Sequence, residues 1–521
     1  MTAGAAEADG RTAPPGPAET GRWRRLDPRT YVVTALVLAG VVVIAGAPAA
    51  LGIMAALGVA RATLWTVAGA VLATALGTGV DYVRRRRTGY RVGPERAELR
   101  QGLLLVKRRS LPLERIRTVD LTASPLLRVF GLVTVRIGTG EHARDGALEL
   151  ESVARAEGER LRRELLAHTP VPKAPPPDEG TLAAIRPAWV LYAPVSFLSP
   201  LLAGASVGGL LQVSDWFGAQ RDVIGLVARC FRHAPLGWAV AGSAAAALAA
   251  GAVGALGVWT EMWWNHRLER EPGGTLRVRR GLFTARSVSI EERRLRGVEV
   301  VEPLGVRLLR AARVDAVATG LVHKDAGEKH VDHRNLLPAA PRAVAHAVAA
   351  RVLREPVPPT AAPLAAHPAA ARGRRLRRAL AAALAPVGLA AVLGPWWAAA
   401  CAAAVALPAA AALARSAYRA LGHGLSGPYL VARSGAVRRS TVALQRSGVI
   451  GWTVRQSYVQ RRAGLVTLTA TTAAGRGRYR VPDAAESEAL AFAEEAVPGL
   501  LAPFLITRPP RGGDSSVRHA L

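Results

Sequence analysis

Long apolar stretches bracketed by arginine limit the folds that this chain can adopt. Tyr31 to Val80 is apolar apart from Arg61 and a few small polar groups, and residues 188–213, 236–260 and 379–414 resemble it. A helix needs about 20 mainly apolar residues to cross a bilayer. These stretches therefore predict six transmembrane helices in three hairpin pairs. The alternative is a buried Ala-rich core of a soluble protein, which fits less well because basic clusters flank three separate stretches.

Composition places the rest of the chain in water. Half of the 521 residues are hydrophobic and 20% are charged, which is too many charges for a pure membrane bundle. The net charge of +30 is carried almost wholly by arginine, and it indicates an anionic partner. Nucleic acid is not expected, because no helix-turn-helix, zinc or aromatic RNA-binding signature accompanies the arginines. Cys230 and Cys401 are the only cysteines, so no disulfide framework is expected.

Arginine clusters also predict the orientation. They lie at residues 22–25, 84–87 and 372–378, whereas the turns within the first and third pairs carry almost no positive charge. Basic flanks stay in the cytoplasm, so both termini and the water-exposed segments are expected there, in a bacterial inner membrane. The polar connector 214–235 could lie on the outer face as an amphipathic helix. The polar N-terminus lacks the features of a cleavable signal peptide.

Each predicted helix pair is followed by a segment with strand-like alternation, and the three segments resemble one another. "GLVT" occurs at Gly131–Thr134 and again at Gly464–Thr467, while the middle copy has lost that glycine and reads Ala311. Two further positions align in all three copies, a glycine and, about 26 residues later without gaps, an arginine. The positions that define the copies are Gly102, Arg128 and Gly131 in the first, Gly281 and Arg307 in the second, and Gly435, Arg461 and Gly464 in the third.

The spacing within a copy predicts a sheet closed by a helix. In "IRTVDL" (Ile116–Leu121) apolar residues recur at every second position, the period of a strand with one buried face. Each copy then ends in a helical pattern that reaches His168, Leu353 or Leu505. We therefore expect an α+β membrane protein. It would have six transmembrane helices in three hairpin pairs and three small β-barrel or sandwich modules, each capped by a C-terminal helix.

The same residues resemble a known family. "PLERIRTVDL" and "SPLLRVFGLVTVRI" look like the bacterial pleckstrin-homology (PH) domain of the YdbS/YdbT type. The first copy matches at Pro112, Arg115, Ile116, Ser124, Leu127, Arg128, Gly131 and Leu132. The third matches at Gln456, Ser457, Gln460, Arg461, Gly464 and Leu465, and the degenerate second keeps Pro303, Leu304 and Arg307. Three modules, each after a helix pair, resemble the YdbT-like arrangement over nearly the whole chain.

The resemblance implies a PH-like fold of about seven strands and one helix, and no established reaction. It also implies, as a partner, a shorter YdbS-like membrane protein with one PH domain, and a homo- or hetero-oligomer. The expected boundaries are a disordered tail at 1–28, helix pair 1 at 29–82, module 1 at 88–168, a linker at 169–186, helix pair 2 at 187–262, module 2 at 265–354, a Pro/Ala/Arg linker at 355–376, helix pair 3 at 378–415, module 3 at 421–507 and a disordered tail at 508–521.

Basic residues near the first hairpin of each module are the candidate contacts for anionic lipids. They are Lys107, Arg108, Arg109, Arg279, Arg280, Arg438 and Arg439. In lipid-binding PH domains such residues hold phosphorylated headgroups, and guanidinium groups suit phosphate. General attraction to an anionic leaflet is the other interpretation, and both stay open. The aligned Arg128, Arg307 and Arg461 are expected to be structural, each covering an apolar edge or pairing with a carboxylate.

Patterns for catalysis and metal binding are weak. "HKDAGEKHVDHRN" (residues 323–335) holds three histidines, yet the other copies lack them, so a polar loop is expected there rather than a metal site. Phosphate-binding, serine-elbow and zinc-protease motifs are absent. We therefore expect a non-enzymatic membrane protein, without cofactor, that presents its modules to protein, peptide or lipid. By analogy it could act in envelope stress or in resistance to membrane-active agents. The alternative is a transporter or permease-like component with regulatory modules.

Overall fold

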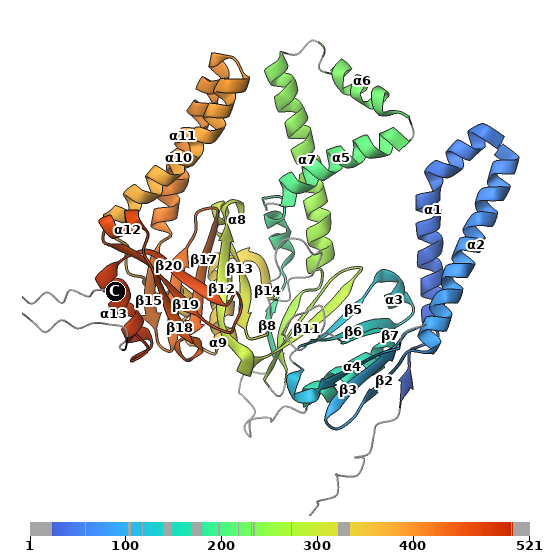
Figure 1. Ribbon diagram of the computed structural model, residues 1–521, viewed down its shortest axis with the longest axis horizontal. Coiled ribbons are helices and arrows are strands. Elements are labelled where there is room, and N and C mark those ends of the chain that lie inside the picture. The colour runs from blue at the N-terminus through green and yellow to red at the C-terminus, as the bar shows by residue number, and fades with distance from the viewer. Residues whose placement is uncertain are drawn as a thin grey trace, which may run out of the picture. The chain divides into compact units, whose positions relative to one another are not determined.

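The computed structural model describes residues 23–501 and 503, except for 58, 103–105, 117, 139–147, 168–179, 196–197, 217, 231, 233–234, 272–273 and 321–333. The chain is α+β (Figure 1). It forms two compact units. Unit 1 holds residues 1–116, 126–139 and 146–170, and unit 2 holds the remainder. The short segment 117–125 belongs to unit 2 although both of its flanks belong to unit 1.

Unit 1 contains a helical hairpin, preceded by one short strand and followed by the other strands. Its helices are α1 (Thr30–Leu57), α2 (Val59–Arg86), the one-turn α3 (Pro125–Val129) and α4 (Arg155–Ala167). Its strands are β1 (Arg24–Arg25), β2 (Gly89–Val92), β3 (Arg96–Gln101), β4 (Lys107–Pro112), β6 (Leu132–Gly138) and β7 (Leu148–Ala154). The first four form one antiparallel sheet in the order β1-β2-β3-β4, and β6 pairs with β7. Leu132, Ile137, Leu150 and Leu161 are fully buried, so α4 covers the β6–β7 pair.

Unit 2 contains the other strands and helices. Its strands are β5 (Thr118–Ala123), β8 (Gly180–Ala184), β9 (Arg267–Glu271), β10 (Thr275–Arg280), β11 (Ala285–Glu291), β12 (Leu295–Pro303), β13 (Ala311–Ala318), β14 (Asn335–Pro341), β15 (Gly422–Ser426), β16 (Tyr429–Ser434), β17 (Arg438–Gln445), β18 (Gly451–Arg455), β19 (Leu465–Thr471) and β20 (Arg478–Ala485). Its helices are α5 (Leu198–Trp216), α6 (Gln220–Cys230), α7 (Leu236–Trp263), α8 (Leu304–Leu308), α9 (Arg342–Leu353), α10 (Ala369–Leu393), α11 (Trp396–Arg419), α12 (Tyr458–Arg462) and α13 (Glu486–Ala496).

The order of elements repeats three times along the chain. We call residues 89–167, 267–353 and 422–496 repeats 1, 2 and 3. Each gives three strands, a 3-10 turn (Leu113–Arg115, Glu292–Arg294 or Arg446–Gly448), a fourth strand, a five-residue helix (α3, α8 or α12), two more strands and a longer helix. The turns and the five-residue helices coincide in the alignment without a gap. The described residues form six strands in each repeat, where the family resemblance implied about seven.

The glycine of the "GLVT" sequence lies in a turn that all three repeats share. Gly131 and Gly464 have φ values of +70° and +60°, in the left-handed region that glycine enters without strain. The equivalent residue of repeat 2 is Arg310, with φ +52°. The sequence interpretation placed Ala311 there, which is wrong by one residue, because Ala311 already begins β13. The turn is therefore kept in repeat 2 at the cost of a left-handed arginine.

Gly281 and Gly435 hold their positions for a different reason. Their φ values are +113° and +108°. A Cβ atom at Gly281 would lie 2.0 Å from the Thr284 carbonyl oxygen, and one at Gly435 would lie 1.9 Å from that of Arg438. The turn into the third strand therefore closes too tightly for any side chain. Gly102 has φ +147° at the same place in repeat 1.

Three segments differ from the expected boundaries. The expected linker at 169–186 contains β8, which pairs with β9. In the expected linker at 355–376, Pro359–Ala361 form a 3-10 turn, Thr360 is buried, and α10 begins at Ala369. Within the expected N-terminal tail, Arg24 and Arg25 pair with β2; residues 1–22 and the expected tail at 508–521 lie outside the described residues. The pairings of β1 and β8 could not be predicted from composition, because strand pairing uses backbone groups.

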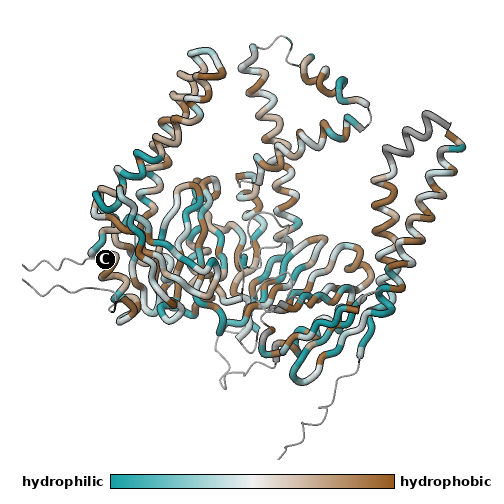
Figure 2. The backbone as a smooth tube through the Cα atoms, in the orientation of Figure 1, coloured by the Kyte–Doolittle hydropathy of each residue, from teal (hydrophilic) through white to brown (hydrophobic). Residues whose placement is uncertain are grey.

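Four described helices are long and apolar enough to cross a membrane. They are α2, residues 237–263 of α7, α10 and α11. Residues 30–43 of α1 are apolar over a shorter length. The third predicted span begins differently, since Pro187–Tyr192 form a 3-10 turn and α5 starts at Leu198. Figure 2 shows the apolar colouring along α7, α10 and α11, with hydrophilic residues at the base of α10. Six spans in three pairs thus remain a prediction.

Candidate functional site

The predicted lipid contacts do not share one environment. Lys107 and Arg108 are exposed at the start of β4, and Arg109 is half-buried. Arg280 is 4% exposed and packs over the ring of Trp263, 4.4 Å from its centroid. The structure thus separates Lys107 and Arg108, which are exposed, from Arg280, which lies in the interior of unit 2.

Arg438 and Arg439 bind carboxylates of the chain itself. Arg439 Nη1 lies 3.3 Å from Glu302 Oε2, and Arg438 Nη2 lies 3.5 Å from Glu299 Oε1. The Ser440 hydroxyl donates to Glu299 Oε1 at 2.6 Å. Both glutamates are buried, so they need these donors. The residues therefore hold β17 of repeat 3 against β12 of repeat 2.

These contacts belong to a strand joint, by which we mean the pairing of the fourth strand of one repeat with the third strand of the next. β12 and β17 pair antiparallel over seven residues, from Gly297 opposite Leu444 to Pro303 opposite Arg438. The joint extends one sheet across both repeats in the order β14-β13-β12-β17-β16-β15. Its core is shared, because Val298, Val300, Val431 and Ala443 belong to one hydrophobic cluster.

A second joint has the same register. β5 pairs antiparallel with β11, with Ser287 opposite Leu121 and Ile290 opposite Thr118 (Figure 1). In the alignment of repeats these pairs correspond to Thr441 opposite Val300 and Leu444 opposite Gly297. This pairing explains why β5 belongs to unit 2. The fourth strand of a repeat thus joins the third strand of the following repeat in one fixed way.

Two strands are left at the edges of the described sheets. The third strand of repeat 1 is β4, which ends the order β1-β2-β3-β4, and the fourth strand of repeat 3 is β18, which begins the order β18-β19-β20. Their exposure differs from that of the joined strands. β11 and β12 are mostly buried, whereas β4 has three exposed residues and the others half-buried. Unpaired strand edges are templates for pairing with another chain.

The aligned arginines have different neighbours. Arg307 donates from Nη2 to the Ser416 hydroxyl at 3.0 Å, which ties α8 to α11. Burial lowers the pKa of Arg307, and the nearby Arg439 lowers it further. Arg461 is exposed. At Arg307 the described side-chain contact is to the third helical hairpin, and the role predicted for the aligned arginines, covering an apolar edge or pairing with a carboxylate, stays a prediction.

A polar cluster forms the base of that hairpin. Asp483, 1% exposed, accepts hydrogen bonds from Arg374 and Gln460 and lies 3.0 Å from Arg375 Nη2. Its carbonyl oxygen lies 3.0 Å from His367 Nδ1. Because Arg374 and Arg375 belong to α10 and Asp483 to β20, the cluster fixes the helix to the last strand of repeat 3.

Two histidines extend the cluster inward. His367 Nε2 and His423 Nδ1 are 3.1 Å apart, and the Tyr418 hydroxyl donates to the His367 carbonyl oxygen at 2.9 Å. Burial lowers the pKa of His423 to about 4 and lowers that of His367 as well. Both side chains are therefore neutral at physiological pH. Such a pair suits packing and orientation rather than proton transfer.

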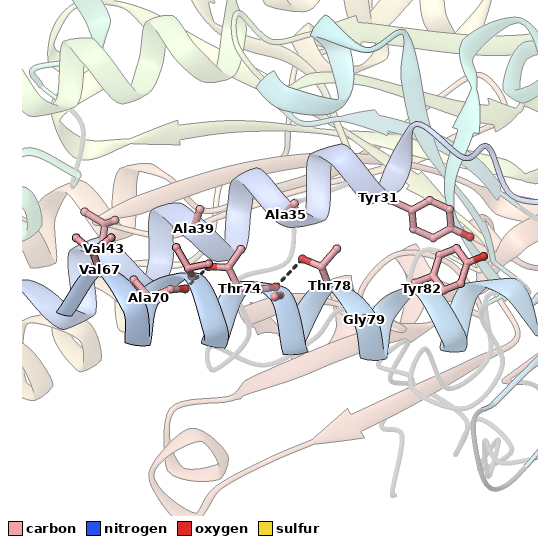
Figure 3. Close-up of a pocket in the computed structure, with 12 residues that line it drawn as sticks. Tyr31, Ala35, Ala39, Val43, Val67, Ala70, Thr74, Thr78, Gly79 and Tyr82 are labelled. Atoms are coloured by element: carbon pink, nitrogen blue, oxygen red, sulfur yellow. Dashed lines mark hydrogen bonds between the residues drawn. The ribbon is translucent and has the colours of Figure 1, made fainter. Parts of the chain in front are cut away.

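An apolar groove lies between α1 and α2 (Figure 3). It has a volume of about 780 Å³ and is lined by alanine, valine and threonine side chains, with Tyr31 and Tyr82 at one end. The two tyrosine rings are 4.9 Å apart. The threonine hydroxyls are satisfied within the helix, since Thr78 donates to the Thr74 carbonyl oxygen at 2.7 Å. The groove therefore offers apolar contact and suits a hydrocarbon chain or another helix.

Sequence reasoning missed the carboxylates that matter in these sites. Glu299, Glu302 and Asp483 are each less than 5% exposed. The available signal was an acidic residue inside an alternating strand, where burial makes a charge costly unless it is paired. The predicted histidine-rich loop falls at 323–333, outside the described residues. Among the residues that are described, no group of three or more histidine, cysteine, aspartate or glutamate side chains could hold a metal ion.

The comparisons with known proteins agree with part of this picture. The family model described as Bacterial PH domain matches residues 33–169 and 379–496. These ranges take in repeats 1 and 3, most of the helices before them, and none of repeat 2. No curated protein matched the chain, and no solved structure matched it either. Over these two ranges the chain is similar to bacterial PH domains, while the finer YdbS/YdbT-like assignment stays a prediction.

Proposed function

We propose that the protein is a non-enzymatic integral protein of the bacterial inner membrane that displays its three repeats as PH-like binding modules on the cytoplasmic side. Its ligands are polypeptides or anionic lipids at strand edges and basic surfaces. The observation that carries the proposal is that the apolar helices leave their side chains exposed while each joins a folded strand module. Val392 and Trp396, for example, are each 82% exposed.

Exposed apolar side chains over whole helices have a large free-energy cost in water, roughly 25 cal/mol for each Å² of apolar surface. A bilayer removes that cost. The similarity to bacterial PH domains supports the module, because its two matches run from apolar helices into the strands that follow. Attachment to one anchor raises the effective concentration of weak binding modules.

A transporter or permease-like component with regulatory modules is the second candidate. The groove of about 780 Å³ between α1 and α2 favours it, since an apolar groove can take a hydrophobic ligand. Replacing each helical hairpin by an unrelated membrane anchor separates the two candidates. Retained ligand binding and cellular activity support the binding protein, and lost activity with intact modules supports a transport path.

Cysteine labelling tests the membrane arrangement. In a protein without Cys230 and Cys401, single cysteines replace Glu114, Arg293 or Arg478, exposed residues of the three repeats. A maleimide that cannot cross membranes should label none of them in intact spheroplasts and all of them after permeabilisation. Labelling of any one from outside the cell contradicts the arrangement.

A further inference from the structure

We propose that the open edge of β4 binds an acidic, extended segment of another polypeptide, which pairs with β4 as β12 pairs with β17. The inference deepens the proposed binding function and rests on it, by naming the site and the chemical class of one partner. It follows from three observations. The two strand joints share a register, the backbone of β4 has groups that face outward, and the charge on β4 matches the carboxylates that arrive at a joint.

The backbone of β4 is prepared for a further strand. The Leu113 N–H donates to the Glu95 carbonyl oxygen at 2.8 Å. Hydrogen-bonded and non-bonded pairs alternate along an antiparallel ladder, so the N–H and C=O groups of Arg108 and Ser110 face away from β3. In the second and third repeats the equivalent bonds are Glu292 to Gly274 and Arg446 to Pro428, each 2.8 or 2.9 Å long. There, the equivalent outward edges of β11 and β17 carry β5 and β12.

Side chains on β4 fit an acidic strand. In the joint between β12 and β17, Glu299 lies opposite Val442 and accepts from Ser440. The residues of β4 at the positions of Ser440 and Val442 are Lys107 and Arg109. A carboxylate at the position of Glu299 on an incoming strand would therefore lie opposite Arg109 and beside Lys107, both able to form charge-assisted hydrogen bonds.

A second copy of the chain does not supply that strand. By the shared register, β18 of a second copy would place Arg455 opposite Lys107, and like charges directly opposite are unfavourable. β18 also carries Thr453 at the position of Glu299, and Gln456 follows it at the position of Glu302. The open edge of β18 thus lacks the carboxylate that would lie opposite Arg109 and beside Lys107.

An anionic lipid surface accounts for fewer features of the β4 edge than an incoming strand does. It could meet Lys107 and Arg108, but headgroups do not satisfy the alternating N–H and C=O groups of a strand as a second strand does. The equivalent strand of repeat 3 carries Arg438 and Arg439, which bind glutamates of a neighbouring strand. In the joint between β12 and β17, therefore, a basic third strand meets an acidic fourth strand.

A peptide with the sequence of β12 serves as the probe. A labelled peptide with the sequence LRGVEVVEP, that of residues 295–303, is titrated against the full-length protein in phosphatidylcholine nanodiscs, and binding is followed by fluorescence anisotropy. We expect saturable binding, and at least about tenfold weaker binding of LRGVQVVQP, because charge-assisted hydrogen bonds are lost. A peptide with the β18 sequence VIGWTVRQS should bind at least about tenfold more weakly as well.

One substitution isolates the edge. Ser110→Pro removes an N–H that faces outward and should leave the pairing with β3 intact, since proline is tolerated on edge strands at such positions. We expect Ser110→Pro to abolish peptide binding and Ser110→Ala to retain it. Circular dichroism and the unfolding temperature of both variants establish that unit 1 is folded. If Ser110→Pro unfolds unit 1, the double substitution Lys107→Gln with Arg109→Gln replaces it, with at least about tenfold weaker binding expected.

Several results would overturn the proposal. They are no binding of the acidic peptide up to about 1 mM, equal binding of the β18 peptide, which would indicate a second copy, and equal binding by the folded Ser110→Pro variant. Displacement of the peptide by phosphatidylglycerol vesicles, combined with tight vesicle binding by Ser110→Pro, would assign the edge to lipid. Cysteine labelling from outside the cell would contradict the proposed membrane function, whereas peptide binding at this edge could still be measured.

Discussion

Glu302 of β12 lies directly opposite Arg439 of β17, and their side-chain oxygen and nitrogen atoms are 3.3 Å apart. The pair connects repeat 2 to repeat 3 at the end of a seven-residue ladder. Glu302 also meets Arg342 of α9, whose Nε is 3.1 Å from Oε1. One buried carboxylate therefore joins two strands and a helix that are far apart in the sequence.

Removal of that carboxylate should destabilise unit 2. Glu302→Ala leaves the half-buried Arg439 without this carboxylate and also removes the contact of the exposed Arg342. We expect a loss of about 2 kcal/mol in the free energy of unfolding. Urea-dependent proteolysis of the detergent-solubilised protein measures it. The matched control is Glu98→Ala, which breaks the half-exposed pair with Arg91 and should cost less than about 1 kcal/mol. Equal losses in the two variants would show that the Glu302 pairs stabilise the protein no more than the Arg91–Glu98 pair does.

The left-handed arginine offers a second test. Arg310 is exposed and has φ +52°, so Arg310→Gly should stabilise the protein by about 1 kcal/mol. The reverse change, Gly464→Arg, should destabilise it by a similar amount. A Cβ atom at Gly464 would meet no atom within 4 Å, so only the backbone opposes the change. Thermal unfolding of the two variants should shift in opposite directions, and a shift of the same sign in both would contradict the shared turn.

Buried histidines should make stability depend on pH. The folded pKa values of His423 and His266 are lowered from 6.5 to about 4, mainly by burial. The unfolded chain therefore binds more protons between these values, and stability present above pH 6.5 is lost as the pH falls toward 4. For His423 alone the loss is on the order of 3 kcal/mol. Thermal unfolding from pH 7.5 to 4 measures it, and His423→Phe should flatten the profile; an unchanged slope in that variant would exclude His423 as a source.

The crossing of α5 and α7 should tolerate no larger residue at Gly251. A Cβ atom there would lie 2.2 Å from the Ser199 carbonyl oxygen and 2.7 Å from the Ala203 nitrogen. We expect Gly251→Ala to separate the two helices and to lower the stability of the hairpin by about 1–3 kcal/mol. Gly257→Ala, on the same helix, has open space around its Cβ and should be neutral. Unfolding in sodium dodecyl sulfate compares them, and equal behaviour would mean that the crossing is not tight.

The turns show most clearly how much of the structure the sequence predicts. The glycines at 102, 281 and 435 align in the three copies, and each of these residues has a positive φ. The one-turn helices α3, α8 and α12 lie where the aligned arginines indicated a repeated element. The roles of the basic residues could not be read in the same way. Arg280 and Arg439 look like surface charges in the sequence, but they pack on Trp263 and pair with Glu302.

The local elements follow from the sequence alone: apolar helices in hairpins, strands with one buried face, and the turns that separate them. These depend on periodicity and on the backbone limits of glycine and proline, which act over a few residues. The strand pairings follow from the folded chain instead: β5 pairs with β11, β12 pairs with β17, and β4 and β18 remain at the edges of the described sheets. Strand pairing is made by N–H and C=O groups that nearly every residue carries, so the partner of a strand depends on which edges packing brings together.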